Sequence, residues 1–76
     1  MNYQVTEEMR NRIEKTFSYH PPKDDQPQRY VVIRDAAKGL ATLIVTCVPP
    51  SRELSLALTA LEEVVMQANA GIARNE

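Results

Sequence analysis

Apolar side chains recur at helical spacing in three stretches of the chain. The first stretch is a stripe with intervals of four residues, and the other two alternate intervals of three and four, which is typical of a heptad seam. The stripe comprises Val5, Met9, Ile13 and Phe17; the seams comprise Tyr30, Ile33, Ala37, Leu40, Ile44 and Cys47, and Leu54, Leu58, Leu61, Val65, Ala68 and Ile72. The pattern predicts helices over about residues 6–17, 27–47 and 52–74, with a loop over residues 18–26.

The second and third predicted helices are separated by a turn at residues 48–51, which contains Pro49 and Pro50. Proline lacks an amide hydrogen and its ring clashes with the preceding helical turn, so neither helix can continue through this pair. A connection this short forces its two helices to lie antiparallel. We therefore expect an all-α fold: a single domain over residues 1–76 with a short N-terminal helix and a long antiparallel helical hairpin, the seams of which pack at about 20°.

Capping residues mark the helix starts. Thr6 and Ser51 each stand before acidic residues, and a hydroxyl cap followed by carboxylates suits the positive end of a helix. Asp25 and Gln28 match a capping box, with Pro27 in the first turn, where its missing amide costs little. These signals give each predicted helix a defined beginning.

Each long helix also carries apolar residues outside its seam. These are Val31, Val32, Leu43, Val45 and Val48 in the second helix, and Leu56, Ala57, Ala60, Val64 and Met66 in the third. A two-helix hairpin has one inner face, so this surplus would lie in water, and exposed apolar patches usually mark protein interfaces. The first helix is too short to be stable alone and must dock on its own hairpin or on a neighbouring chain. The pattern thus predicts a homo-oligomer.

Composition is consistent with self-association. A lone domain of 76 residues is marginally stable and often needs a disulfide, a metal or a partner subunit. The single cysteine, Cys47, excludes an internal disulfide and is expected to be a small buried residue of its seam. No cysteine and histidine cluster has zinc spacing, and capping accounts for Asp25 beside Asp24, so neither a metal nor a cofactor is expected.

Charge and hydropathy argue against two classes of partner. The net charge of −1 is unsuited to binding duplex nucleic acid, although a few converging cations can still hold a small anion. No apolar run approaches the ~20 residues of a membrane span, and residues 1–9 are polar and acidic, unlike a signal peptide. We therefore expect a cytoplasmic protein that binds no membrane.

No catalytic residue is expected. His20 has no nucleophile near it in the sequence, and a histidine between an aromatic residue and two prolines usually packs in a loop. Basic and aromatic residues are more informative, because they gather at the open end of the predicted hairpin. Arg29 and Arg74 lie about 30–36 Å from the turn, and the loop with Tyr19 and Lys23 enters at that end.

Arg34 and Lys38 follow along one face of the second helix, since they are four residues apart. Arginine donates in a fork to phosphate oxygens, and an aromatic ring offers a surface on which a base stacks. These residues therefore suggest an anion or nucleotide site. The alternative is a solvated surface in which both cations pair with carboxylates, Arg74 offsets the helix dipole and Tyr30 belongs to the core.

Three parts of the sequence carry a resemblance to a known family. They are Phe17-Ser18-Tyr19-His20-Pro21-Pro22-Lys23 with Asp25-Gln26, Arg29-Tyr30 and Ile33-Arg34; Cys47-Val48-Pro49-Pro50-Ser51-Arg52-Glu53; and Ala68-Asn69-Ala70-Gly71-Ile72-Ala73-Arg74-Asn75. Over residues 17–75 the chain resembles the phage-encoded anti-CBASS/anti-Thoeris hairpin family. Members of that family are sponges for the cyclic nucleotide signals that activate bacterial immune effectors.

The resemblance implies a compact homo-oligomer, a hexamer as in the best-known branch of the family. It implies cyclic dinucleotides such as cGAMP as ligands, bound between protomers and not cleaved, with cyclic trinucleotides or cyclic ADP-ribose isomers as ligands of some members. The family's pocket residues correspond here to Tyr19, Arg34 and Arg74, with Lys23 and Lys38 as further candidates. Beside Arg34 this chain has Ala36 and Ala37 in place of hydroxyl side chains, and in this it departs from the family members that have a separate trinucleotide site.

Three function classes stay open at this point. The first is a non-enzymatic nucleotide sponge that acts in the host cytoplasm. The second is an adaptor hairpin whose apolar faces bind a protein partner. The third is a hydrolase of the same nucleotides, for which the sequence offers no visible nucleophile, base or metal set.

Overall fold

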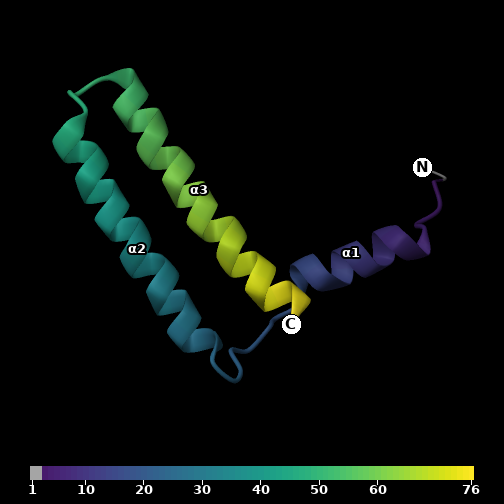
Figure 1. Ribbon diagram of the computed structural model, residues 1–76. Coiled ribbons are helices and arrows are strands. Elements are labelled where there is room, and N and C mark those ends of the chain that lie inside the picture. The colour runs from purple at the N-terminus through teal and green to yellow at the C-terminus, as the bar shows by residue number, and fades with distance from the viewer. Residues whose placement is uncertain (1–2) are drawn as a thin grey trace.

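The computed structural model describes residues 3–76, which form three helices and no strand (Figure 1). Helix α1 spans Glu7–Phe17, α2 spans Gln26–Cys47 and α3 spans Arg52–Asn75. Helices α2 and α3 lie side by side and antiparallel, and α1 projects away from their open end. The expected all-α fold, a short N-terminal helix followed by a long antiparallel hairpin, is confirmed.

The closed end of the hairpin is built as the double proline dictates. Val48 precedes Pro49 and is extended, with φ −116° and ψ 129°, while its amide still donates to the carbonyl of Ile44 at 2.9 Å. The hydroxyl of Ser51 donates to the carbonyl of Pro49 at 2.9 Å and accepts from the amide of Leu54 at 3.1 Å. The side chain of Ser51 therefore ends the turn and begins α3, as its predicted capping role requires.

The start of α1 is capped as expected, and the start of α2 is not. The hydroxyl of Thr6 accepts from the amide three residues later at 3.1 Å. Asp25 makes no capping bond, and its carboxylate instead lies 3.2 Å from the guanidinium of Arg29. The capping box expected for Asp25 and Gln28 is therefore wrong, because the ion pair draws the carboxylate away from the helix end. The turn before it places Asp24 at φ 53°, a left-handed conformation that aspartate tolerates.

The inward face of α2 differs from the expected heptad seam, whereas the six seam residues of α3 are all half-buried. Ala41 in α2 and Val48 directly after it are half-buried, while Leu40 is 46% exposed and Cys47 is exposed. The half-buried apolar residues of α2 and its C-cap are Tyr30, Ile33, Ala37, Ala41, Ile44 and Val48, with intervals that average the 3.6 residues of a straight α-helical turn. A heptad seam drifts by about 20° per repeat on such a helix, so the expected burial of Leu40 and Cys47 is wrong.

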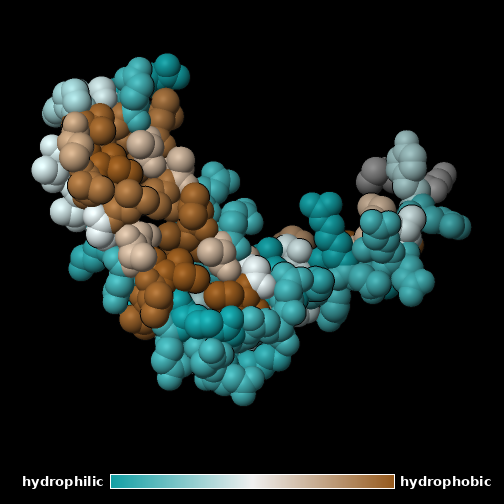
Figure 2. Space-filling model, viewed as in Figure 1, coloured by the Kyte–Doolittle hydropathy of each residue, from teal (hydrophilic) through white to brown (hydrophobic). Residues whose placement is uncertain are grey.

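The molecule is a single layer of helices. Its extents are 51 × 37 × 13 Å, and the shortest is close to the diameter of one α-helix, about 10–12 Å. Its radius of gyration is 17.2 Å, whereas a compact domain of this length has about 11 Å. Among residues 3–76 no apolar residue is fully buried, and only Gln26 is, with 2% exposed. Figure 2 shows the consequence: a continuous apolar surface over α2 and α3, bounded by polar residues at the open end.

The apolar stripe of α1 also lies open. Its four residues, of which Val5 precedes the helix, are at least half exposed, and Phe17 is 81% exposed. The polar side of α1 meets the hairpin instead, where the ammonium of Lys15 donates to Oδ1 of Asn75 at 3.1 Å. The hairpin of the same chain therefore does not cover the stripe, and docking of α1 on a neighbouring chain remains a prediction.

We expect Ser51→Ala to lower the free energy of unfolding by about 1 kcal/mol, because the mutation removes the cap of α3. Ser55→Ala, one turn further along the same helix, is the matched control and should change stability by less than about 0.5 kcal/mol. Urea unfolding followed by circular dichroism measures both values. Equal effects of the two substitutions would contradict the capping role of Ser51.

Candidate functional site

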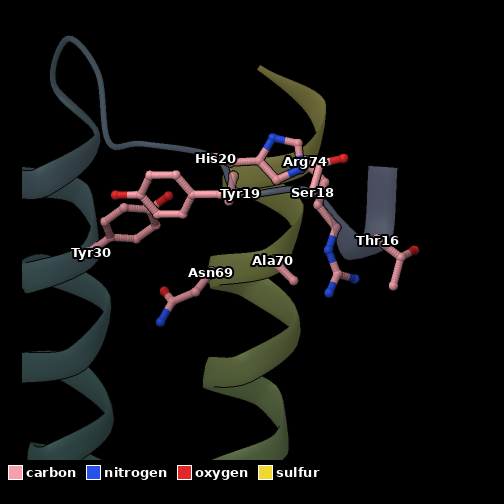
Figure 3. A pocket seen from close by; sticks show the side chains of 9 residues that line it. Thr16, Ser18, Tyr19, His20, Tyr30, Asn69, Ala70 and Arg74 are labelled. Carbon is pink, nitrogen blue, oxygen red and sulfur yellow. The ribbon is translucent and has the colours of Figure 1, made fainter. Parts of the chain in front are cut away.

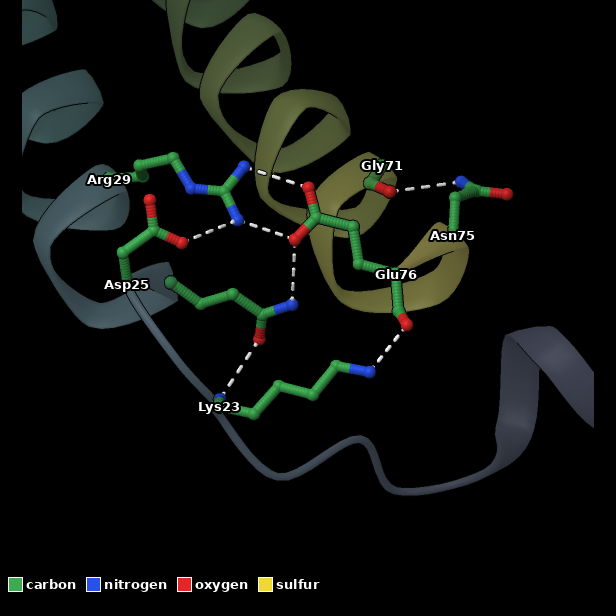
Figure 4. Close-up of polar contacts among 7 residues, drawn as sticks. Lys23, Asp25, Arg29, Gly71, Asn75 and Glu76 are labelled. Carbon is green, nitrogen blue, oxygen red and sulfur yellow. Dashed lines mark hydrogen bonds and ion pairs between the residues drawn. The ribbon is translucent and has the colours of Figure 1, made fainter.

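A polar cluster around Glu76 holds the open end of the hairpin together (Figure 4). Both terminal nitrogens of the Arg29 guanidinium donate to the Glu76 carboxylate, one of them at 2.7 Å. The buried Gln26 donates through Nε2 to that carboxylate at 3.1 Å and accepts from the amide of Lys23 at 3.2 Å. Nζ of Lys23 donates to the main-chain oxygen of Glu76. These four residues, here called the Glu76 cluster, join the loop to both helix ends.

The Glu76 cluster is electrostatically self-contained. The hydrogen bond from Arg29, followed by the one from Gln26, lowers the pKa of Glu76 to about 2. The same contact with Glu76 raises the pKa of Arg29, so both groups are charged at neutral pH. The terminal nitrogens of Arg29 and the ammonium of Lys23 are therefore engaged within the chain, and a ligand would have to compete with Glu76 for them. Nε of Arg29 is buried and has no hydrogen-bond partner among residues 3–76.

A hollow of about 440 Å³ lies beside this cluster, between the loop, α2, α3 and the end of α1 (Figure 3). We call it the tyrosine hollow. It is lined by Thr16, Ser18, Tyr19, His20, Tyr30, Asn69, Ala70, Ala73 and Arg74. The hollow thus combines residues from segments that lie far apart in the sequence, and it faces solvent on one side.

The tyrosine hollow has an aromatic side and a basic side. In Figure 3 the side chains of Tyr19, Tyr30 and Asn69 lie between α2 and α3, whereas the guanidinium of Arg74 lies on the other side of α3, toward Thr16. Tyr19 is 84% exposed, so its ring has a free face. Neither Tyr19 nor Arg74 makes an ion pair or side-chain hydrogen bond with another residue of the described range 3–76. The arrangement offers a stacking surface together with a cation.

Two other polar side chains border the tyrosine hollow. Nε2 of His20 lies 2.8 Å from the carbonyl oxygen of Lys15, and because a carbonyl only accepts, this nitrogen carries the hydrogen. His20 therefore fastens the loop to the end of α1. Oδ1 of Asn69 is buried and has no hydrogen-bond partner among the residues that the structure describes. Asn69 thus carries a buried acceptor that has no partner among residues 3–76, at the aromatic side of the hollow.

Arg34 and Lys38 lie outside the tyrosine hollow. Together with Glu62 they border a separate groove of about 490 Å³ between α2 and α3, the floor of which is formed by Ala37, Ala41, Leu58, Leu61 and Val65. Both cations are exposed, and within residues 3–76 neither lies within ion-pair distance of a carboxylate. The ion pairs of the alternative interpretation, a neutralised solvated face, are therefore not formed among residues 3–76.

The structure divides the five candidate residues among three places. Tyr19 and Arg74 border one hollow, as expected from the fold-back at the double proline. Lys23 belongs to the Glu76 cluster, and Arg34 and Lys38 border the groove along the hairpin. Contact of any of these residues with a ligand remains a prediction.

One family model, described as the Acb2/Tad1 hairpin domain, matches residues 9–73, which is most of the chain. The chain belongs to this family. Acb2/Tad1 hairpins are phage anti-CBASS and anti-Thoeris sponges, anti-defence proteins known for binding cyclic nucleotides and not for catalysis. The resemblance drawn from the sequence is confirmed. Comparisons with curated proteins and with solved structures each found no match.

Two further properties of this Acb2/Tad1 hairpin concern residues 3–76. None of the helices there is long and apolar enough to cross a membrane. No group of three His, Cys, Asp or Glu side chains in that range is arranged to hold a metal ion.

Sequence reasoning did not place Asn69 near the candidate site of this Acb2/Tad1 hairpin, and it assigned Tyr30 to the apolar seam of the second helix. The structure brings both residues to the tyrosine hollow. A signal for this was available, because Tyr30 and Asn69 lie at equal distances before and after the Pro49–Pro50 pair. In an antiparallel hairpin such positions face one another, so an asparagine opposite a tyrosine near the open end was a candidate for the site.

We expect the Glu76 cluster to open in acid. The folded-state pKa of Glu76 is about 2, below its usual 4.5, so its contribution to stability is complete above about pH 4.5 and is lost as pH falls toward 2. Hydrogen exchange of the first amides of α2 is measured from pH 6 to pH 2.5, and their protection factors (the intrinsic exchange rate divided by the observed rate) should fall over that window. Glu76→Gln should remove this extra acid dependence. If the wild-type protein and the variant follow the same pH profile, the cluster does not stabilise the open end.

Proposed function

We propose that this chain binds and sequesters cyclic oligonucleotide immune messengers, in particular cyclic dinucleotides such as cGAMP, without cleaving them. It thereby blocks activation of CBASS effectors in the host cytoplasm. The observation that carries this proposal is the tyrosine hollow, which is lined by Tyr19 from the loop, Tyr30 from α2 and Arg74 from α3. Aromatic rings stack on bases of any sequence, and a guanidinium donates to phosphate oxygens, so the residue types suit this ligand class.

The unpaired cations of the neighbouring groove support the same ligand class. A cyclic dinucleotide carries two phosphates, and a single arginine leaves one of them without a partner. Arg34 and Lys38 have no ion pair among residues 3–76 and could supply that charge from a second protomer. Lys23 is a weaker candidate, because its ammonium already donates to Glu76.

The proposal includes assembly into a homo-oligomer, a hexamer as the family resemblance implies. A single layer of helices with a continuous apolar face is completed when a second layer covers it. A two-fold interface would also present each tyrosine and each cation twice, once for each half of a cyclic dinucleotide. Cyclic trinucleotides and cyclic ADP-ribose isomers are further candidate ligands. An adaptor that binds another protein through the same apolar face is the second candidate function.

One experiment separates the proposed sponge from the two other classes. The purified protein is incubated with cGAMP, freed of unbound ligand, denatured and analysed for the released nucleotide by liquid chromatography and mass spectrometry. We expect stoichiometric release of intact cGAMP. An altered nucleotide would identify an enzyme. Absence of bound nucleotide across a panel of cyclic di- and trinucleotides and ADP-ribose isomers would favour the adaptor.

The residue assignments are tested by calorimetric titration of variants. We expect Tyr19→Ala to weaken cGAMP binding about 5- to 150-fold through loss of stacking, and Arg34→Ala to weaken it about 10-fold or more through loss of a charged donor. Tyr3→Ala and Arg52→Ala are matched controls, because Tyr3 is 92% exposed outside the tyrosine hollow and Arg52 begins α3 at the closed end. Multi-angle light scattering should show the same oligomer for all four variants. Unchanged affinity in both test variants would exclude this site.

A further inference from the structure

Oδ1 of Asn69 is a buried acceptor with no partner among residues 3–76. Asn69 lies in α3, and its side chain points toward α2 beside the rings of Tyr19 and Tyr30 (Figure 3). Its position is therefore at the aromatic side of the tyrosine hollow, away from the guanidinium of Arg74.

A buried polar atom without a hydrogen bond destabilises the free protein. Buried acceptors are nearly always paired, and an asparagine in the middle of a helix also has low helix propensity. An apolar residue of the same size would therefore be better for folding at this position. A group that is costly to the free protein and borders a binding hollow is typical of a residue that makes its hydrogen bond to a ligand.

We propose that Asn69 determines base specificity by hydrogen bonding to the edge of a base stacked on Tyr19 and Tyr30, and that it favours adenine. The inference rests on the proposed function and adds to it the choice among cyclic nucleotides. The carboxamide presents one acceptor and one donor side by side. Adenine presents the complementary pair, the N6 amino group as donor and an adjacent ring nitrogen as acceptor, in the bidentate arrangement that asparagine makes with adenine.

The chemistry of the amide gives a change-of-specificity test. In Asn69→Asp the donor becomes a second acceptor, which suits the two adjacent donors of guanine, N1–H and the N2 amino group, and repels the ring nitrogen of adenine. The probes are cyclic di-AMP and cyclic di-GMP, titrated by calorimetry against the wild-type protein and the variant. We expect the wild-type protein to prefer cyclic di-AMP. The ratio of the two dissociation constants should move toward cyclic di-GMP by about 5- to 150-fold in the variant.

Asn69→Leu provides a second variant of similar volume that carries no buried charge. We expect it to lose the preference for cyclic di-AMP and, because the unpaired acceptor is gone, to raise the Tm of the ligand-free protein by about 4 °C or more. A lower Tm with an unchanged preference would show that Asn69 serves the fold and would overturn the inference. Dissociation of the oligomer in this variant would show that a neighbouring protomer supplies the missing donor, and would overturn it as well.

The outcomes for this inference and for the proposed function are distinct. If all proteins bind both probes with one ratio of dissociation constants, Asn69 does not read the base, while the nucleotide sponge stands. If neither the wild-type protein nor the variants bind any cyclic nucleotide, the proposed function fails and this inference fails with it. The Ser55→Ala protein serves as the control for substitution in α3 away from the tyrosine hollow.

Discussion

The packing of α2 against α3 along one face fixes where every other feature of the molecule lies. A pair of helices side by side has a contact line and no interior, so the residues along that line are half-buried and none of the apolar residues among 3–76 is fully buried. The hydrophobic effect scales with the apolar area removed from water, and a single layer of helices removes little of it. The apolar surface left on α2 and α3 is therefore a direct result of the fold (Figure 2).

The open end shows how the chain offsets this weak packing with polar contacts. The Glu76 cluster joins the loop, the start of α2 and the end of α3 through charge-assisted hydrogen bonds centred on one carboxylate. Its most buried member is Gln26, which satisfies both ends of its amide within the cluster. By holding the two helix ends and the loop together, the cluster also positions the neighbouring tyrosine hollow, which borders the same loop and the same helix ends.

Five cations at the open end and along the groove fall into two groups with different consequences. Arg29 and Lys23 are neutralised by Glu76 and maintain the fold of the open end. Arg34 and Lys38, beside the groove, and Arg74, in the tyrosine hollow, make no ion pair among residues 3–76. Membership in the Acb2/Tad1 hairpin family gives this division a meaning, because a sponge for anionic cyclic nucleotides requires cations that its own carboxylates do not neutralise.

The sequence by itself determined the features that depend on near neighbours in the chain. The caps at Thr6 and Ser51, the stop at Pro49 and Pro50, and the apolar face of α3 are fixed by local backbone chemistry and by periodicity, and the structure confirms them. The family could also be identified from the sequence, because the resemblance is carried by short local runs.

Only the tertiary structure decided features that depend on residues far apart. Ala41 and Val48 are half-buried, whereas Leu40 and Cys47 are exposed. Which of these pairs is buried depends on whether α2 is straight or supercoiled, and the heptad pattern in the sequence does not specify this. The loss of the Asp25 cap depends on Arg29, and the neutralisation of Arg29 depends on Glu76 at the far end of the chain. That Oδ1 of Asn69 is buried without a hydrogen-bond partner among residues 3–76 likewise depends on its neighbours in space. Burial and pairing are set by three-dimensional neighbours, and residue spacing along the chain specifies those neighbours only in part.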